Sequence, residues 1–224
     1  MSFVVTIDGP SAAGKSTVAR EVAARLGFLY VDTGALYRAL ALKLGAGGGS
    51  VEDAEGIERM LAATRLDLSG SPAEPHVWLD GEDVSDAIRT SQVTAHIRYA
   101  ADNPRVREHL VKLQQAIGRT GNMVTEGRDQ GTVVFPHAEC KIFLTASPHE
   151  RARRRVDDLQ QRGETPALAD VLAQQVARDQ RDSSRAVGPL VKAPDAVEVV
   201  TDGWSIGQVV DRLADIVGER QRRI

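Results

Sequence analysis

The chain has 224 residues, which fits one compact domain with a sizeable core. Hydrophobic residues make up 42% of it and charged residues 26%, which excludes disordered and fibrous proteins. The net charge of −3 gives no global cationic surface, so we expect no nucleic-acid partner. The first residues lack the features of a signal peptide, and no window is apolar enough to span a membrane. We therefore expect a cytoplasmic protein with no membrane partner.

Short apolar runs alternate with helical patterns along the chain. The runs predict buried strands at Phe3–Ile7, Phe28–Val31, Asn122–Thr125, Cys140–Ala146 and Ala196–Val200. Capping signals predict helices from Thr17 to Leu26, from Pro148 to about Gln161, and within 102–118 and 203–218. The alternation predicts an α/β fold in which helices cover both faces of a parallel sheet.

One region breaks this alternation. Leu66–Val84 has short alternating runs, separated by turns of Gly, Pro and Asp, and predicts a small antiparallel insertion. The preceding stretch Gly45–Ser50 follows no strand, so we interpret it as a flexible connection and not as a phosphate-binding loop.

The stretch "TIDGPSAAGKST" (Thr6–Thr17) contains a phosphate-loop motif. Gly9, Gly14, Lys15 and Ser16 satisfy G-x-x-x-x-G-K-[ST], with an apolar strand before the loop and a helix after it. Glycines allow backbone N–H groups to converge on phosphate oxygens at a helix N-terminus. Lys15 would neutralise the β and γ phosphates, and the Ser16 hydroxyl would bind Mg²⁺. The predicted ATP site comprises Gly9, Pro10, Ser11, Ala12, Ala13, Gly14, Lys15, Ser16 and Thr17.

A phosphate loop alone does not separate a kinase from a GTPase or a motor ATPase. The guanine-reading motif Asn-Lys-x-Asp is absent from the sequence, and "MVTEGRD" (123–129) is a poor match to the acidic strand end of motor ATPases. Phosphoryl transfer to a second, bound substrate remains as the predicted chemistry.

The ends of the second and third predicted strands supply residues for that substrate. Thr33 and Arg38 lie at the start of a helix, where a hydroxyl and a guanidinium favour an anion. Arg128 and Asp129 follow the third predicted strand, Asn122–Thr125. They should face the same cleft, because ligands bind at the carboxyl ends of parallel strands. The alternatives are a helix cap beside a surface arginine for the first pair, and a surface ion pair for the second.

Two arginine groups lie later in the chain. Arg178, Arg181, Asp182 and Arg185 share one face of a predicted helix. Arg151, Arg154 and Arg155 form a second group, for which a solvated charged face is an equal alternative. This number of guanidinium groups is excessive for a protein of net charge −3.

Six motifs together resemble the bacterial cytidylate kinases: "TIDGPSAAGKST", "DTGALYRALAL", "LDGEDVSDAIRT", "PRVREHL", "EGRDQGTVVFP" and "RDQRDSSRAVGPL". The resemblance implies a P-loop three-layer fold with a five-stranded parallel sheet, a small antiparallel β insertion that binds the monophosphate, and a short helical lid. It divides the chain into a kinase core (1–62 and 98–224, with the lid at about 156–183) and an insertion (63–97).

The resemblance also implies roles for individual residues. Those that would bind CMP are Thr33, Arg38, Arg107, Arg128, Asp129, Arg178, Asp182 and Arg185, with Arg107 and Asp129 reading cytosine and Arg178 and Asp182 touching the ribose. Arg154 and Arg155 would approach the donor phosphates when the lid closes. The predicted catalytic residues, which neutralise the two substrates, are Lys15, Arg128, Arg155 and Arg185.

One position departs from the family pattern. Arg98 stands where a small serine that contacts the base is expected, so either "AHIRYAA" (95–101) packs differently or that contact is lost. Asp129 can still select cytosine, because a carboxylate accepts from its N4 amine but faces an acceptor in uracil.

The predicted reaction is ATP-dependent phosphorylation of CMP, and of dCMP, by a monomer with Mg²⁺. The alternatives are a different small-molecule kinase, such as a uridylate or shikimate kinase, and a non-catalytic nucleotide-dependent regulator.

Overall fold

The computed structural model describes residues 2–46, 53–161 and 163–223. Its central sheet contains β1 (Val4–Asp8), β2 (Leu29–Asp32), β6 (Met123–Gly127), β7 (Cys140–Thr145) and β8 (Val197–Val200). The five strands are parallel and lie in the order β2-β6-β1-β7-β8. Each lies within a residue or two of a predicted apolar run, so the five-stranded parallel sheet is confirmed.

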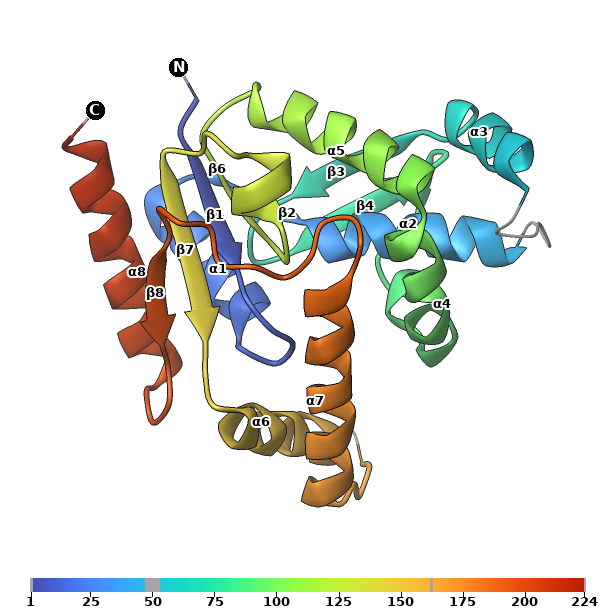
Figure 1. The fold of residues 1–224 in the computed structure, drawn as a ribbon. Helices are drawn as coiled ribbons and strands as arrows, with labels where there is room; N and C mark the ends of the chain where they lie inside the picture. The colour runs from blue at the N-terminus through green and yellow to red at the C-terminus, as the bar shows by residue number, and fades with distance from the viewer. Residues whose placement is uncertain (1, 47–52, 162, 224) are drawn as a thin grey trace.

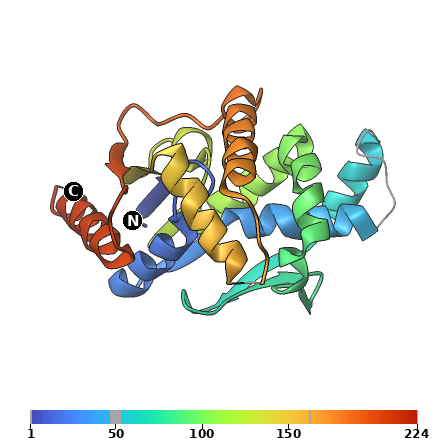
Figure 2. The same cartoon turned by 90° about the horizontal axis from the view of Figure 1, so that it is seen from below.

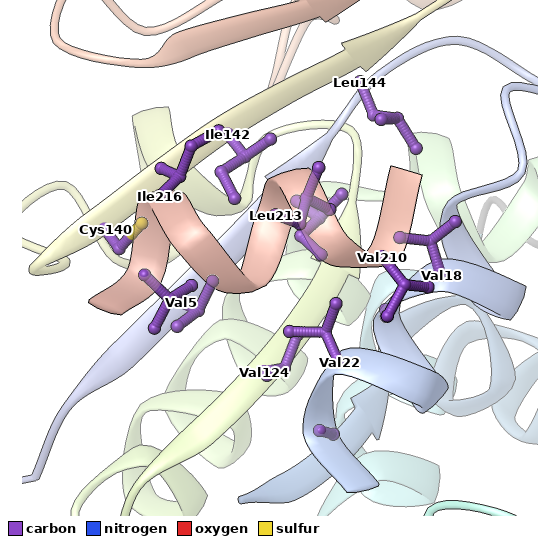
Figure 3. Packing of buried hydrophobic residues seen from close by; sticks show 14 of the residues in the cluster. Val5, Val18, Val22, Val124, Cys140, Ile142, Leu144, Val210, Leu213 and Ile216 are labelled. Atoms are coloured by element: carbon purple, nitrogen blue, oxygen red, sulfur yellow. The ribbon is translucent and has the colours of Figure 1, made fainter. Parts of the chain in front are cut away.

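Helices α1 (Lys15–Leu26) and α8 (Ile206–Gln221) cover one face of this sheet (Figure 1). Valines and leucines of both helices meet the inward side chains of β1, β6 and β7 (Figure 3). Cys140, the one cysteine of the chain, is buried in this cluster, as predicted. The other face carries α5 (Pro104–Gly118) and the short π-helical segment η2 (Gln130–Val134). There Ile117 of α5 and Phe135, which follows η2, pack against Val4, Val31 and Met123.

A second apolar cluster lies beside the sheet. It joins α2 (Thr33–Ala46), α3 (Ala54–Ala62), η1 (Ala87–Arg89), α4 (Ser91–Asp102) and α5 to the three-stranded sheet of β3 (Leu66–Gly70), β4 (Pro75–Leu79) and β5 (Glu82–Asp83). This sheet is antiparallel, which confirms the predicted insertion. Helix α4 packs along α2 and crosses the proposed domain boundary between 97 and 98, so that division stays a proposal.

The connection predicted at Gly45–Ser50 falls mostly outside the described residues, because α2 runs to Ala46 and 47–52 are not described.

Helices α6 (Pro148–Gln160) and α7 (Leu168–Ser184) contact each other at the carboxyl ends of the strands. Seen from below, they lie between α8 at one end of an elongated molecule and α3 at the other (Figure 2). Ser147 caps α6 by accepting from the N–H of Glu150, with Pro148 in the first turn, as the sequence predicts. The sheet thus presents its strand ends to the α2–α4 unit on one side and to α6 and α7 on the other.

Candidate functional site

The phosphate loop joins β1 to α1, which begins at Lys15, two residues before the predicted start. Gly14 caps α1 with φ +86°, and Gly9 has φ +155°. A Cβ on Gly9 would lie 1.9 Å from the backbone oxygen of Leu144, so only glycine lets the loop pass this close to β7. The loop is therefore held by backbone geometry on both sides, with its amides at the N-terminus of α1.

Lys15 lies inside this loop. Its side chain is buried, and Nζ donates to the carbonyl oxygen of Pro10 at 2.7 Å. Burial, together with the positive charge of Arg128, lowers the pKa of Lys15 to about 7, although Glu126 opposes the shift. A bound polyphosphate would supply the negative charge that restores the ammonium, so this lysine is suited to an anionic ligand.

Glu126 is a site residue that the sequence prediction missed. It is the penultimate residue of β6, the neighbour of β1, and its carboxylate accepts a hydrogen bond from the hydroxyl of Ser16. Asp32 ends β2 opposite Glu126 in the strand register, and burial together with the charge of Glu126 raises the pKa of Asp32 to about 6. The sequence carried a signal for it, because Glu126 directly follows the predicted strand Asn122–Thr125 in a stretch that is a poor match to the motor ATPase motif.

The oxygen donors around Ser16 suit a hard divalent cation. Ser16 is exposed and Glu126 lies against its hydroxyl, so a hydroxyl and a carboxylate face the end of the phosphate loop. Mg²⁺ prefers such oxygen ligands together with phosphate oxygens and water. The residues present therefore fit the ion, and Ser16 stays the proposed ligand.

The start of α2 supplies the first predicted acceptor residues. Thr33 is buried, and its hydroxyl donates to the carbonyl oxygen of Glu126 at 2.7 Å. Arg38, one turn further on, donates through Nη1 to the hydroxyl of Thr94 on α4 at 2.8 Å and to the carbonyl oxygen of Ile88 at 3.3 Å. Thr33 therefore lies at the strand ends, whereas Arg38 is held against the α4 side.

Arg128 joins the phosphate loop to α7. Its Nη1 donates to the carbonyl oxygen of Gly9 at 3.1 Å, and its Nε donates to Asp182 at 2.9 Å. Asp129 turns the other way and forms a buried ion pair with Arg107 of α5. Burial raises the pKa of Asp129, although Arg107 opposes the shift. The structure thus brings together the two residues expected to read the base.

Asp8 fixes the turn that carries Arg128 and Asp129. Its carboxylate accepts from the N–H groups of Gln130 and Gly131 at 2.8 and 2.7 Å. Burial raises the pKa of Asp8 to about 6, and the two hydrogen bonds oppose that rise. The end of β1 therefore positions the acceptor-side loop as well as the phosphate loop.

Asp182 is the centre of an arginine cluster on α7. Besides Arg128, it accepts from Arg185 at 3.1 Å and lies 3.9 Å from Nε of Arg178. Burial alone would raise the pKa of Asp182, but Arg128 and the other guanidinium groups bring the net pKa below its ordinary value. The helical face predicted from the sequence is present, with Arg185 just beyond the end of α7.

The second arginine group has divided roles. Arg151 is buried and donates to the carbonyl oxygens of Ala146 and Ser11, while its Nη1 lies 2.7 Å from Asp179. The solvated-face alternative is wrong for Arg151, because it joins the phosphate loop to α6 and α7. Arg154 donates to both oxygens of Thr201, and Arg155 is half-buried.

Arg98 lies on the surface of α4, a regular helix. Its Nη2 donates to the hydroxyl of Tyr99 at 2.7 Å, and the guanidinium lies 4.7 Å from the centre of that ring.

The fold and the loop are those of a P-loop nucleotide-binding protein. The family model for cytidylate kinase matches residues 5–219. A cytidylate kinase of Rhodopirellula baltica is 47% identical over 217 residues, which cover 97% of this chain and 93% of the relative. The chain belongs to the cytidylate kinase family.

Other relatives are longer than this chain. A bifunctional pantoate ligase/cytidylate kinase of Synechococcus sp. strain WH7803 is 49% identical over 217 residues, which are 96% of this chain but 44% of that protein. The chain thus spans less than half the length of this relative. A solved structure of an uncharacterized protein from Eubacterium ventriosum matches 98% of this chain and 99% of its own, with a TM-score of 0.53 and 9% identity, and shows the fold alone.

Within the described ranges, no helix combines the length and hydropathy needed to cross a membrane.

Proposed function

We propose that the protein transfers the γ-phosphoryl group of ATP to CMP, and also to dCMP, giving ADP with CDP or dCDP in pyrimidine nucleotide metabolism. Membership of the cytidylate kinase family supports the substrate. One observation supports phosphoryl transfer between two bound substrates. Arg128 contacts both the phosphate loop, at Gly9, and the arginine cluster of α7, at Asp182. These contacts support a donor site and an acceptor site that would be contiguous.

The donor phosphates would lie in the loop 9–17. Its backbone amides and Lys15 would hold the phosphate oxygens, and Mg²⁺, when bound at Ser16, supplies further neutralising charge. Arg154 and Arg155 would approach these phosphates from α6. Arg154 must first release Thr201, its partner in this structure.

The acceptor phosphate would be held by Thr33, Arg38, Arg128 and Arg185. A phosphate oxygen is already anionic at neutral pH, so no strong general base is required. The obstacle is the repulsion between two anions, and the guanidinium groups reduce it while they orient the attacking oxygen. Closure of α6 and α7 over the site would exclude water, the competing acceptor.

The buried pair of Arg107 and Asp129 would select the base. The Asp129 carboxylate would accept a hydrogen bond from the cytosine N4 amine, and Arg107 would favour its ionised form and orient it. UMP would place a carbonyl oxygen against the same carboxylate and leave two acceptors unpaired. The roles of Arg178 and Asp182 at the ribose, a cytoplasmic location and a monomeric state stay predictions.

An acceptor panel tests this proposal. The protein is given ATP and Mg²⁺ with CMP, dCMP, UMP, AMP or shikimate, and ADP release is measured. We expect rapid release with CMP and dCMP, and at least about 10²-fold slower release with the others, since a mispaired polar site discriminates strongly. Preference for UMP or shikimate would favour the alternative kinases, and no acceptor-dependent release would favour a regulator.

A further inference from the structure

One face of α4 contacts two of the arginines that would bind the acceptor phosphate. Thr94, Arg98 and Asp102 are spaced by four residues and share this face. Thr94 accepts a hydrogen bond from Arg38, which comes from α2, and Asp102 forms an ion pair with Arg185, which follows α7. The two arginines are 147 positions apart in sequence (185 − 38), yet the side chains of both contact α4. We call Thr94, Arg98 and Asp102 the α4 strip.

Arg185 is shared between two carboxylates of different character. Its Nε lies 2.8 Å from Asp102, and its Nη2 lies 3.1 Å from Asp182. The Asp182 side chain is 9% exposed and also pairs with Arg128, whereas the Asp102 side chain is 57% exposed. An ion pair with a half-exposed partner is weak and easily exchanged, and a buried one is retained.

We propose that Asp102 is a positioning residue that holds Arg185 in the absence of acceptor and competes with the acceptor phosphate for it. This inference rests on the proposed function. A phosphate dianion carries more charge than a carboxylate and offers three oxygens, so it displaces Asp102 from Arg185. Asp182 keeps its contact and maintains the orientation of Arg185 during the exchange. Asp102 therefore weakens acceptor binding, and it restricts the conformations of the Arg185 side chain when no acceptor is bound.

Arg98 is the alternative partner for the released carboxylate. It precedes Asp102 by one helical turn on the same face, where ion pairs between positions i and i+4 form. In this structure its guanidinium is engaged by the exposed side chain of Tyr99. Because that contact is at the surface, Arg98 can turn to Asp102 at little cost when Arg185 moves to the phosphate. This gives a role to the residue that departs from the family pattern.

The test compares Asp102→Asn with Asp211→Asn. Both changes remove one negative charge from an arginine–aspartate pair, and Asp211 pairs with Arg25 on the surface formed by α1 and α8. We expect Asp102→Asn to lower the KM for CMP by about two- to fivefold, the range of a weak ion pair. The kcat and the KM for ATP should stay within about twofold, a split that a merely structural role would not give. Asp102→Glu should behave like the wild-type protein.

A second measurement separates a direct contact from a general charge effect. The dissociation constant of CMP is determined by titration calorimetry for Asp102→Asn in the wild-type and Arg185→Ala backgrounds. We expect tighter binding only where Arg185 is present, because the two residues act as a pair. Equal tightening in both backgrounds, weaker CMP binding in Asp102→Asn, or no difference from Asp211→Asn would each overturn the inference. Failure of the wild-type protein itself to bind and phosphorylate CMP would instead refute the proposed function.

Discussion

The donor and acceptor sides of the site are built differently. The donor side is a loop of backbone amides, held between β1 and α1 by glycine geometry and by a lysine that is 6% exposed. The proposed acceptor side is a set of arginines that reach in from α2, α5, the end of α7 and the loop after β6, and most of them are already paired with a carboxylate or a hydroxyl. One side is fixed by the backbone and the other by exchangeable side-chain contacts.

This difference indicates how phosphoryl transfer can be made to depend on the binding of both substrates. In the proposed reaction, the backbone of the preformed loop would hold the ATP phosphates, whereas the acceptor arginines would have to exchange partners before they neutralise a second phosphate. The complete set of positive charges would then be available only when both substrates are present, which would limit transfer to water. We expect donor-side changes to act on catalysis or stability directly, and acceptor-side changes to leave ATP binding intact.

The largest effect is expected for Lys15→Met. The change removes the only side-chain cation of the phosphate loop while it fills the same buried space. We expect kcat to fall by about 10³-fold, the magnitude for losing a preorganised charge in a site that excludes water. The melting temperature should not fall, since the lysine is buried and its pKa is lowered. Steady-state kinetics and thermal unfolding check both parts. Lys112→Met, at an exposed pair with Glu108, is the control and should change neither.

Arg185→Ala should have the next largest effect. We expect transfer to slow by about 10²-fold, because one of the charges that counters the repulsion between the phosphates is lost. The dissociation constant of ATP should stay within about twofold, since no contact joins Arg185 to the donor loop in the described parts of the chain. Arg181→Ala, at an exposed position on the same helix, is the matched control. Turnover in Arg185→Ala equal to that of the control would remove Arg185 from the catalytic set.

Gly9→Ala and Gly14→Ala compare the two ends of the donor loop. A Cβ at Gly9 meets the backbone of Leu144 at 1.9 Å, whereas a Cβ at Gly14 meets nothing within 4 Å. We expect Gly9→Ala to lower the free energy of unfolding by about 3 kcal/mol, from both overlap and backbone strain. Gly14→Ala should lower it by about 1 kcal/mol, from strain alone. Urea unfolding measures both, and equal losses would contradict the rigid contact with β7.

Asp8 adds a pH dependence to stability. The folded protein holds the carboxyl proton up to a pKa of about 6, whereas the unfolded chain releases it near 3.8. Between these values the native state binds more protons, so the contribution of Asp8 to stability falls as the pH rises from about 4 to 6. The melting temperature of the wild-type protein minus that of Asp8→Asn should fall over this range and stay level above pH 7. A difference that does not change with pH would contradict the raised pKa.

The local features of this protein were predictable, and the contacts between distant residues were not. The strands could be read because buried parallel strands are continuous apolar runs, and the phosphate loop because its motif lies within eight residues. Glu126 was missed because its contact with Ser16 spans 110 positions and depends on β1 and β6 being neighbours. Arg151 was not separated from the less buried Arg154 and Arg155 because its burial is set by α7. Helix α4 was missed as an element, and its contacts with Arg38 and Arg185 follow from packing alone.

Phosphorus NMR of the purified protein with ATP, Mg²⁺ and CMP tests the central claim most directly, since it follows donor and acceptor phosphates at once. The account predicts that ADP and CDP appear in equal amounts and that ATP is stable without CMP. Release of inorganic phosphate in place of CDP, or no reaction when both nucleotides are present, would contradict it.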